Sequence, residues 1–255
     1  MRRHLRGLGG LLLVTVLILA AGCGGQRLIS RDQEISLGRE AGDQFEAQNG
    51  GRDQNGDIAA LVGPLADRVT AAAEPPDYPY DVRVMKNKEV NAVAFPGGRL
   101  YLYRGLIDKF ERNPDMIAWV LAHEVTHISR EHAVRVIERQ MGYEVVIGLI
   151  LHSGNWAQIA GAVSDLMLLS YSRDNEYEAD RMGMLYAHAA GYDPTAAVAV
   201  LEAFQEIQKH NPNSLELMFA THPGNTERLE QTQRYLTQEG WSGHWYTPGG
   251  QPQAP

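Results

Sequence analysis

The residues most able to do chemistry form one short string, His-Glu-Val-Thr-His at positions 123–127. On an α-helix, residues four apart lie on one face, a single turn apart. His123 and His127 can therefore present two imidazoles to one metal ion, while Glu124 reaches the space beside it. In zinc hydrolases this spacing holds the metal, and the intervening glutamate acts as general base on a water molecule. The string predicts a zinc-dependent hydrolase.

The residues around this string predict a buried helix. Asn113-Pro114-Asp115 combines an N-cap residue, a proline at the first helical position and an acid in the first turn. From Met116 to Ile128 the sequence is apolar nearly all round, which is typical of a helix in a protein core. Ionisable side chains on such a helix need a partner, because unpaired buried charge costs much free energy. A metal ion supplies that partner.

A second string supplies the expected third ligand. The extended metzincin motif needs Gly and His where this chain has Arg130 and Ala133, so that class of zinc site is excluded. The remaining common arrangement takes a carboxylate from a second helix. In the string Glu-Tyr-Glu-Ala-Asp at positions 176–180, Glu176 and Asp180 are four residues apart and share a helix face.

Glu176 is therefore expected to bind one zinc ion per chain together with the two histidines. Asp180, one turn along, can accept the spare N–H of a ligand histidine and fix its tautomer. Glu178 points nearly the opposite way and is expected to be a solvated or salt-bridged surface residue. His132 has no partner at a metal-ligand spacing, which predicts a surface or packed histidine.

Shorter signals outline the elements that must position these side chains. A capping box at Ser30-Arg31-Asp32-Gln33 predicts the start of one helix, and Asp57 is expected to cap another. Strands are expected around Tyr80–Met85 and Glu89–Phe95, followed by a Pro-Gly-Gly turn and a strand at Leu100–Tyr103. Later apolar stretches are too short or too interrupted to cross a bilayer, namely Val145–Leu151 and Ile159–Leu169.

Together these strings resemble the HtpX/BepA/LoiP-type zinc metallopeptidases, which are gluzincins related to the CAAX prenyl protease and the mitochondrial Oma peptidases. The likeness covers most of the chain from Ser30 to Leu236, and it includes Gln33–Gly38, Asn91–Gly98, Arg104–Leu106, Ser172–Gly183, Thr221–Pro223, Arg228 and Leu229. It implies an α+β, mainly helical, zincin-like peptidase domain with a small antiparallel sheet next to the H-E-x-x-H helix.

The same resemblance implies roles outside the zinc ligands. His222 can approach the zinc, where it would block the water position at rest or help to stabilise the oxyanion. Arg228 would stabilise the oxyanion or form a salt bridge with an acid. The substrate is expected to add as an extended strand to an edge formed by Asn91, Ala92, Val93 and Ala94. Because main-chain pairing reads little sequence, selectivity would come from exposure of an unfolded segment.

The first residues predict an export signal with a lipid attachment site. Three arginines precede an apolar run, Leu8–Ala21, that is shorter than the ~20 residues of a spanning helix. Small residues then lead to Cys23, the only cysteine, in a pattern similar to the bacterial lipobox. The expected organisation is a lipoprotein signal peptide at 1–22, a lipidated tether at 23–29, the peptidase domain at 30–246 and a disordered tail at 247–255.

The charge balance limits the partners. The net charge of −8 becomes −11 when the three arginines of the signal are lost, since −8 minus 3 is −11. Nucleic acid is therefore not an expected partner, and neither is anionic lipid as the main one. Gly24, rather than Asp, follows Cys23, which favours the periplasmic side of the outer membrane if the source is Gram-negative.

The sequence thus predicts a zinc-dependent endopeptidase, anchored by lipid in a bacterial cell envelope, that degrades misfolded or unassembled envelope proteins. The alternative is a chaperone or binding lipoprotein that holds such clients while His222 keeps the zinc site closed. A structural zinc protein fits less well, because structural sites use four protein ligands and have no need of Glu124.

Overall fold

The computed structural model describes residues 29–75, 77–139, 170–210, 215–223 and 225–241. Several predicted features lie outside these residues: the signal peptide, Cys23, the apolar stretches at 145–151 and 159–169, and the tail at 247–255. Within the described ranges, no helix combines the length and the apolar character needed to cross a membrane. The predicted α+β, mainly helical architecture is confirmed.

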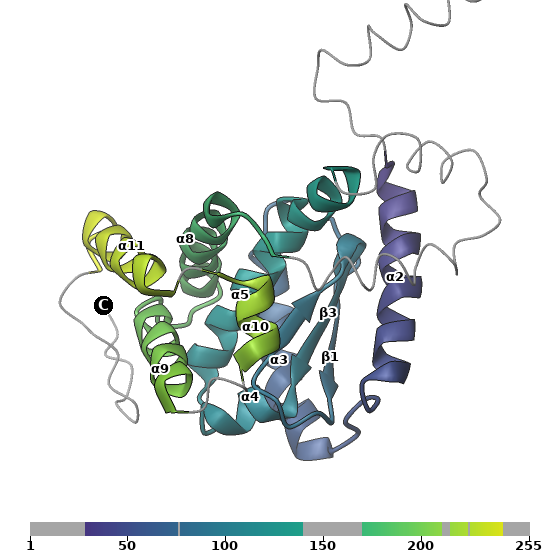
Figure 1. Ribbon diagram of the computed structural model, residues 1–255, viewed down its shortest axis with the longest axis horizontal. Coiled ribbons are helices and arrows are strands. Elements are labelled where there is room, and N and C mark those ends of the chain that lie inside the picture. Colours follow the sequence, from purple (N-terminus) through teal and green to yellow (C-terminus); the bar gives the residue numbers. More distant parts are fainter. Residues whose placement is uncertain (1–28, 76, 140–169, 211–214, 224, 242–255) are drawn as a thin grey trace, which may run out of the picture.

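A three-stranded sheet lies at the centre of the fold (Figure 1). Its strands are β1 (Asp81–Met85), β2 (Ala92–Ala94) and β3 (Arg99–Tyr103), in the order β1-β3-β2. β3 pairs antiparallel with β2 but parallel with β1, so the predicted antiparallel sheet is wrong for one of its two pairs. The chain reverses direction at each connection as expected. After two reversals β3 runs in the same direction as β1. Because β3 lies between the two earlier strands, it pairs with β1 as well as with β2.

The two faces of β3 belong to different hydrophobic clusters. Leu100 and Leu102 pack in the cluster that includes α3 (Gly56–Ala71) and α5 (Pro114–Ser129). Tyr101 and Tyr103 pack in the cluster that includes α2 (Arg31–Gln48), which lies on the opposite side of the strands in Figure 1. This alternation follows from the two-residue period of a strand. Helices therefore cover both faces of the sheet.

Helix starts largely follow the predicted caps. The side chains and backbones of Ser30 and Gln33 form the expected capping box at the start of α2. α5 begins after Asn113, whose side chain accepts hydrogen bonds from the first-turn backbone, as predicted. The cap predicted for α3 is wrong, because Asn55 accepts the backbone N–H groups of Asp57 and Ile58. Asp57 lies in the first turn instead, where its charge favours the helix N-terminus.

The predicted Pro-Gly-Gly turn joins β2 to β3 as a short 3-10 helix, η1 (Pro96–Gly98). Gly97 and Gly98 have φ of 74° and 116°, which side chains with a Cβ rarely adopt. The buried carboxylate of Glu34 accepts the N–H of Gly97 at 3.1 Å. This contact joins α2 to the turn that sets the position of the edge strand β2.

A second layer of helices lies beyond α5. It contains α8 (Arg173–Ala189), α9 (Ala196–His210), α10 (Glu216–Thr221) and α11 (Asn225–Gln238), and α4 (Arg104–Lys109) follows β3. In this layer α8 and α9 pack on α5, and α11 packs on α8 and α9. A Cβ added to Gly183 of α8 would lie 3.1 Å from the backbone nitrogen of His123. α8 therefore approaches α5 closely at the level of the H-E-x-x-H string.

Candidate metal centre

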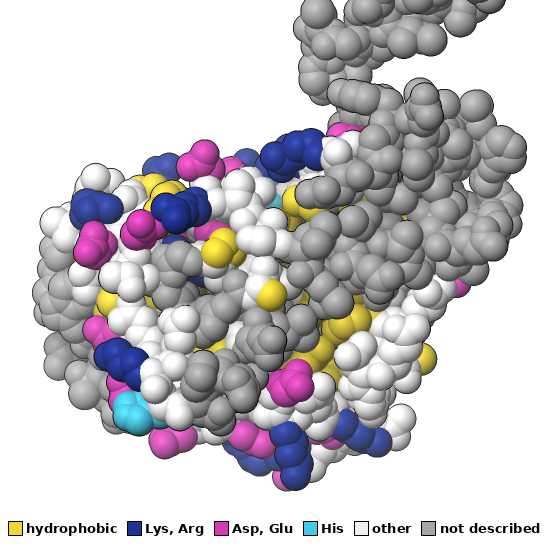
Figure 2. Space-filling model, viewed as in Figure 1, with side chains coloured by type: hydrophobic (Ala, Val, Ile, Leu, Met, Phe, Trp, Pro, Cys, Tyr) yellow, Lys and Arg dark blue, Asp and Glu magenta, His cyan; other side chains and the backbone are white. Residues whose placement is uncertain are grey.

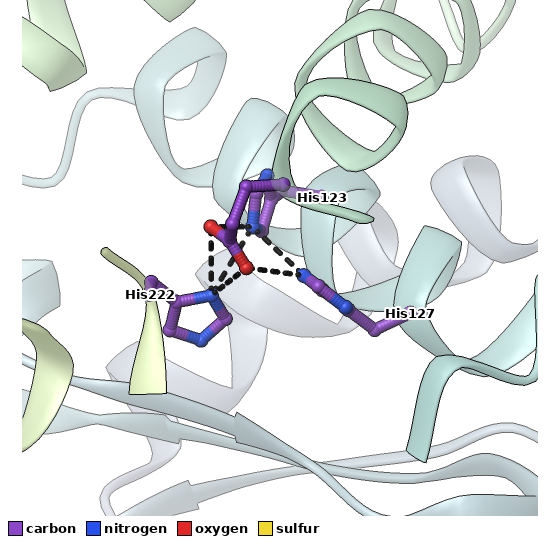
Figure 3. Close-up of side chains that lie close together, drawn as sticks. His123, His127 and His222 are labelled. Atoms are coloured by element: carbon purple, nitrogen blue, oxygen red, sulfur yellow. Dashed lines mark hydrogen bonds and ion pairs between the residues drawn. The ribbon is translucent and has the colours of Figure 1, made fainter. Parts of the chain in front are cut away.

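Four side chains that could hold a metal ion converge between α5, α8 and α10 (Figure 3). α5 contributes His123 and His127, α8 contributes Glu176, and His222 follows the end of α10. Their ligand atoms all lie within 4.8 Å of one another, and all four residues are buried. The structure thus brings together the three expected zinc ligands and the histidine that the family resemblance places near the metal.

The spacing of these atoms fits a tetrahedral zinc ion. Zinc–ligand bonds of 2.0–2.2 Å would separate neighbouring ligand atoms by about 3.3 Å. Nε2 of His127 lies 3.1 Å from Nε2 of His123 and 3.4 Å from Oε1 of Glu176. Nδ1 of His222 lies 3.4 Å from Nε2 of His123 and 3.0 Å from Oε1 of Glu176. The donor set and its spacing therefore suit this metal.

The pKa shifts of His127 and Glu176 also suit a metal site, which needs neutral imidazole and ionised carboxylate. Burial, and then the neighbouring histidines, lower the pKa of His127 well below its ordinary value. Burial alone would raise the pKa of Glu176, but His222 and Arg228 lower it below its ordinary value. The direction is opposite for His222: burial would lower its pKa, yet the Glu176 and Glu124 carboxylates raise it overall, so a metal would have to displace a proton before His222 could bind it.

Arg228 and Asp180 lie directly behind the ligands. Oδ1 of Asp180 is 3.0 Å from Nδ1 of His123, the position expected of a carboxylate that orients this ring. Arg228 donates to Asp180 through Nε at 2.8 Å and through an Nη atom at 2.6 Å. Its other Nη atom lies 2.7 Å from Oε2 of Glu176. The sequence left two roles open for Arg228, stabilisation of the oxyanion and a salt bridge with an acid. These contacts are those of a salt bridge.

Glu124 and His222 border a small cavity next to the cluster. Oε1 of Glu124 lies 3.6 Å from Nε2 of His222. Among the described residues, its buried Oε2 has no hydrogen-bond partner. The cavity has a volume of about 20 Å³, which holds about one water molecule. The other walls of the cavity are mostly apolar and include Leu106, Trp119, Val120, Phe204 and Met218.

The predicted substrate edge lies beside this cavity. β2 contains Ala92, Val93 and Ala94, all buried, and it is preceded by the equally buried Asn91. Ala92 lines the cavity together with His123 and Glu124. Within the described ranges, β2 pairs only with β3, so its other edge has no strand partner there.

The prediction from sequence missed one contact with the cluster, that of His132. His132 is fully buried, and its Nδ1 lies 2.9 Å from Nδ1 of His127. Its Nε2 lies 3.2 Å from Oε2 of Glu178, the acid that was expected at the surface. Burial lowers the pKa of His132 to about 4, so its ring is neutral at neutral pH. The available signal was the apolar pair Ala133-Val134, because a histidine inside a buried segment needs a polar partner.

Comparison with known proteins identifies relatives among the metallopeptidases. The model of peptidase family M48 matches residues 52–236. The chain is 27% identical over 193 residues to the beta-barrel assembly-enhancing protease of Yersinia pestis, covering 71% of this chain and 39% of that protein. The protein of the same name from Escherichia coli (strain K12) is 25% identical over the same shares. The mitochondrial metalloendopeptidase OMA1 of Arabidopsis thaliana is 30% identical over 150 residues, or 58% of this chain and 30% of that protein. The chain thus matches less than half the length of these relatives.

The salt bridge between Arg228 and Asp180 predicts an acid-sensitive contribution to stability. Burial would raise the pKa of Asp180, but Arg228 and then His123 lower it from 3.8 to about 2. Because this value lies below that of the unfolded chain, the pair stabilises the fold above about pH 4, and its contribution disappears as the pH falls towards 2. Arg228→Met should lower the free energy of unfolding of the zinc-free protein by about 3–5 kcal/mol at pH 7, since it leaves buried acids unpaired.

Urea unfolding in the presence of a chelator, at pH 7 and at pH 3, measures this difference. The loss caused by Arg228→Met should be smaller at pH 3. The control is Arg173→Met, which removes the exposed pair of Arg173 with Glu227 at 3.0 Å and should cost less than about 1 kcal/mol. Equal losses for the two variants at pH 7 would contradict the assignment.

Proposed function

Because this chain belongs to peptidase family M48, we propose that it is a zinc metalloendopeptidase whose ligands are His123, His127 and Glu176. The observation that carries the proposal is the buried convergence of these ligands beside Glu124, an acid that the metal site does not need for its own assembly. A structural zinc site would not require a carboxylate at that place. A hydrolytic site does, because the attacking water must lose a proton.

The proposed mechanism assigns a role to each side chain near the ligands. When bound, zinc would lower the pKa of a water molecule to about 7 and polarise the scissile carbonyl. Glu124 takes the proton of the attacking water and passes it to the leaving amine. Asp180 and Arg228 hold His123 and Glu176 in place. Arg228 is excluded as a donor to the oxyanion because its guanidinium is occupied by two carboxylates, and the His222→Ala variant described below decides whether His222 donates to the oxyanion or only blocks the site.

The proposed substrates are misfolded or unassembled proteins of the cell envelope. The printed name of the bacterial relatives, beta-barrel assembly-enhancing protease, supports this class. The edge of β2 supports an extended segment that binds through its main chain next to Ala92. The apolar cavity walls support a large hydrophobic side chain next to the scissile bond. Unfolded envelope proteins expose such extended apolar segments.

The proposed location is the periplasmic side of a bacterial envelope, with a lipid on Cys23. The support is the charged and apolar leader, followed by small residues and the single cysteine. The names of the bacterial relatives agree with an envelope location. In a Gram-negative source, Gly24 after the cysteine favours the outer membrane.

A second candidate function rests on the closed state of the cluster. His222 supplies a fourth ligand atom, and the adjoining cavity holds about one water molecule. A zinc ion with four protein ligands has no position left for substrate. A lipoprotein that binds clients and rarely cleaves them would have this geometry.

For the peptidase function, we propose that His222 blocks the site at rest and that displacement of His222 starts the peptidase cycle.

The two glutamates have different proposed roles, so substitution of Glu124 should impair catalysis and substitution of Glu176 should impair zinc binding. Glu124→Gln should bind zinc as wild type does but cleave casein at least about 10²-fold more slowly, because it cannot accept a proton. Glu176→Gln should lose most of the bound zinc, because an amide replaces the anionic ligand. Metal analysis and casein assays on purified proteins measure both effects. Casein cleavage by Glu124→Gln at the wild-type rate, with contaminating proteases excluded, would overturn the general-base assignment.

Removal of His222 tests the block. His222→Ala should raise the casein cleavage rate several-fold and weaken zinc binding, because it removes one ligand atom and opens a position for substrate. Initial rates at saturating zinc separate the two effects. Turnover that falls by about 10²-fold or more would instead identify His222 as an essential oxyanion donor. Equal protection of unfolded clients by wild type and Glu124→Gln, without cleavage by either, would favour the binding function.

The anchor is tested at Cys23. Cys23→Ser should remain an unlipidated precursor or leave the membrane fraction, because serine has no thiol to carry the lipid. Membrane fractionation and metabolic labelling with a fatty acid measure the change. Unchanged labelling and fractionation would exclude a lipid on this residue.

A further inference from the structure

His132 and Glu178 form a line of contacts that starts at the zinc ligand His127 and ends at the protein surface. Nδ1 of His127 lies 2.9 Å from Nδ1 of His132, and Nε2 of His132 lies 3.2 Å from Oε2 of Glu178. His132 is fully buried, whereas the Glu178 side chain is 43% exposed. We propose that His132 and Glu178 are positioning residues that fix the tautomer and ring orientation of His127. This inference rests on the proposed zinc site.

The direction of the hydrogen bonds follows from the acid at the end of the line. An ionised carboxylate only accepts hydrogen bonds, so Nε2 of His132 must carry a proton. A neutral His132 then has no proton on Nδ1, which accepts the N–H of His127. The proton of His127 therefore lies on Nδ1, and its Nε2 presents a lone pair to the cluster. That Nε2 atom is the one that lies 3.4 Å from Oε1 of Glu176.

The two ligand histidines are thus supported in different ways. His123 meets the carboxylate of Asp180 directly, at 3.0 Å. The Nδ1 atom of His127 instead reaches the carboxylate of Glu178 through the second imidazole of His132. The three acids in the α8 string then have separate roles, because Glu176 is a ligand, Asp180 supports His123, and Glu178 supports His127.

Other contacts of the line limit its movement. The ring of Tyr171 stacks on His127, with centroids 4.0 Å apart and planes inclined by 22°. Nε of Arg130 lies 3.4 Å from Oε1 of Glu178, so a cation faces the acid from the end of α5. Tyr171 supplies no hydrogen bond to the His127 ring, and shape alone does not select between the two tautomers of an imidazole. The arrangement of hydrogen-bond donors and acceptors on His132 and Glu178 does select one tautomer of His127.

The first experiment separates polarity from packing at His132. His132→Gln can accept from His127 through its amide oxygen and donate to Glu178 through its amide nitrogen, whereas His132→Leu fills similar space without either group. We expect zinc affinity to fall 10–100-fold in His132→Leu and to stay within about 3-fold of wild type in His132→Gln. Competition with a chromophoric chelator measures the affinity on the full-length protein, and melting of the zinc-free variants checks their folding.

The second experiment reverses the polarity at the exposed end, where folding is at little risk. Glu178→Lys donates to Nε2 of His132, which moves the proton of His132 to Nδ1 and turns the hydrogen bond with His127 around. Zinc affinity should fall at least 10-fold in this variant and less in Glu178→Ala, because water can replace the lost acceptor. The matched control is Glu202→Lys, which makes the same charge change at an exposed position of α9. It should leave zinc affinity unchanged.

The outcomes separate this inference from the proposed function. Absence of zinc binding by the wild type would overturn the zinc site itself. Wild-type zinc binding, with His132→Leu and Glu178→Lys both within 2-fold of it, would overturn only the positioning role. Equal losses in His132→Gln and His132→Leu would also overturn it, because packing would then explain the effect. Loss in His132→Leu and Glu178→Lys, with His132→Gln and Glu202→Lys near wild type, supports it.

Discussion

The constraint on which the rest of the structure depends is the burial of charge between α5 and α8. Three carboxylates are almost completely buried there, on Glu124, Glu176 and Asp180, and Arg228 is the buried guanidinium that faces them. With the histidines neutral, as metal binding requires, this leaves two formal negative charges at the site, which costs much free energy. A divalent cation held by His123, His127 and Glu176, as proposed, would neutralise them. To share one ion the helices would have to pack closely, and Gly183 permits such a close approach.

The surrounding elements serve this packing. α5 is apolar nearly all round because the sheet, α3 and α8 cover it, so the ligands lie in the core rather than on a mobile surface. The sheet in turn places the edge of β2 beside the cavity. Farther from the site, acidic and basic side chains are interspersed on the face shown in Figure 2. The charged side chains of the site are buried together, where the low dielectric makes each electrostatic contact stronger.

The sequence predicted what a single helix encodes and failed where the chain changes direction. The spacing of His123 with His127, and of Glu176 with Asp180, is readable because a helix fixes which residues share a face. His132 is different, because Arg130 and Glu131 lie between it and the end of α5, and Glu131 has a φ of 56°. The helical spacing of the H-E-x-x-H string therefore does not extend to His132. The pairing of β3 with β1 depends on contacts between distant segments, which local patterns do not carry. Asn55 and Asp57 are both good caps, so the local sequence does not decide between them.

Arg228 on α11 and His222 after α10 hold the candidate metal site through contacts of unequal strength. This difference favours opening of the site by displacement of α10. Arg228 on α11 makes a bidentate contact with Asp180 and a further one with Glu176, so its removal would leave buried acids unpaired. His222 touches the same cluster through one imidazole, and its backbone N–H is held by the carbonyl of Met218 within the same short segment. Displacement of α10 would therefore withdraw His222 and enlarge the apolar cavity while Arg228 still held both carboxylates. The ligand positions would stay fixed as the fourth position became free, which is what a site that opens for substrate without losing its metal requires.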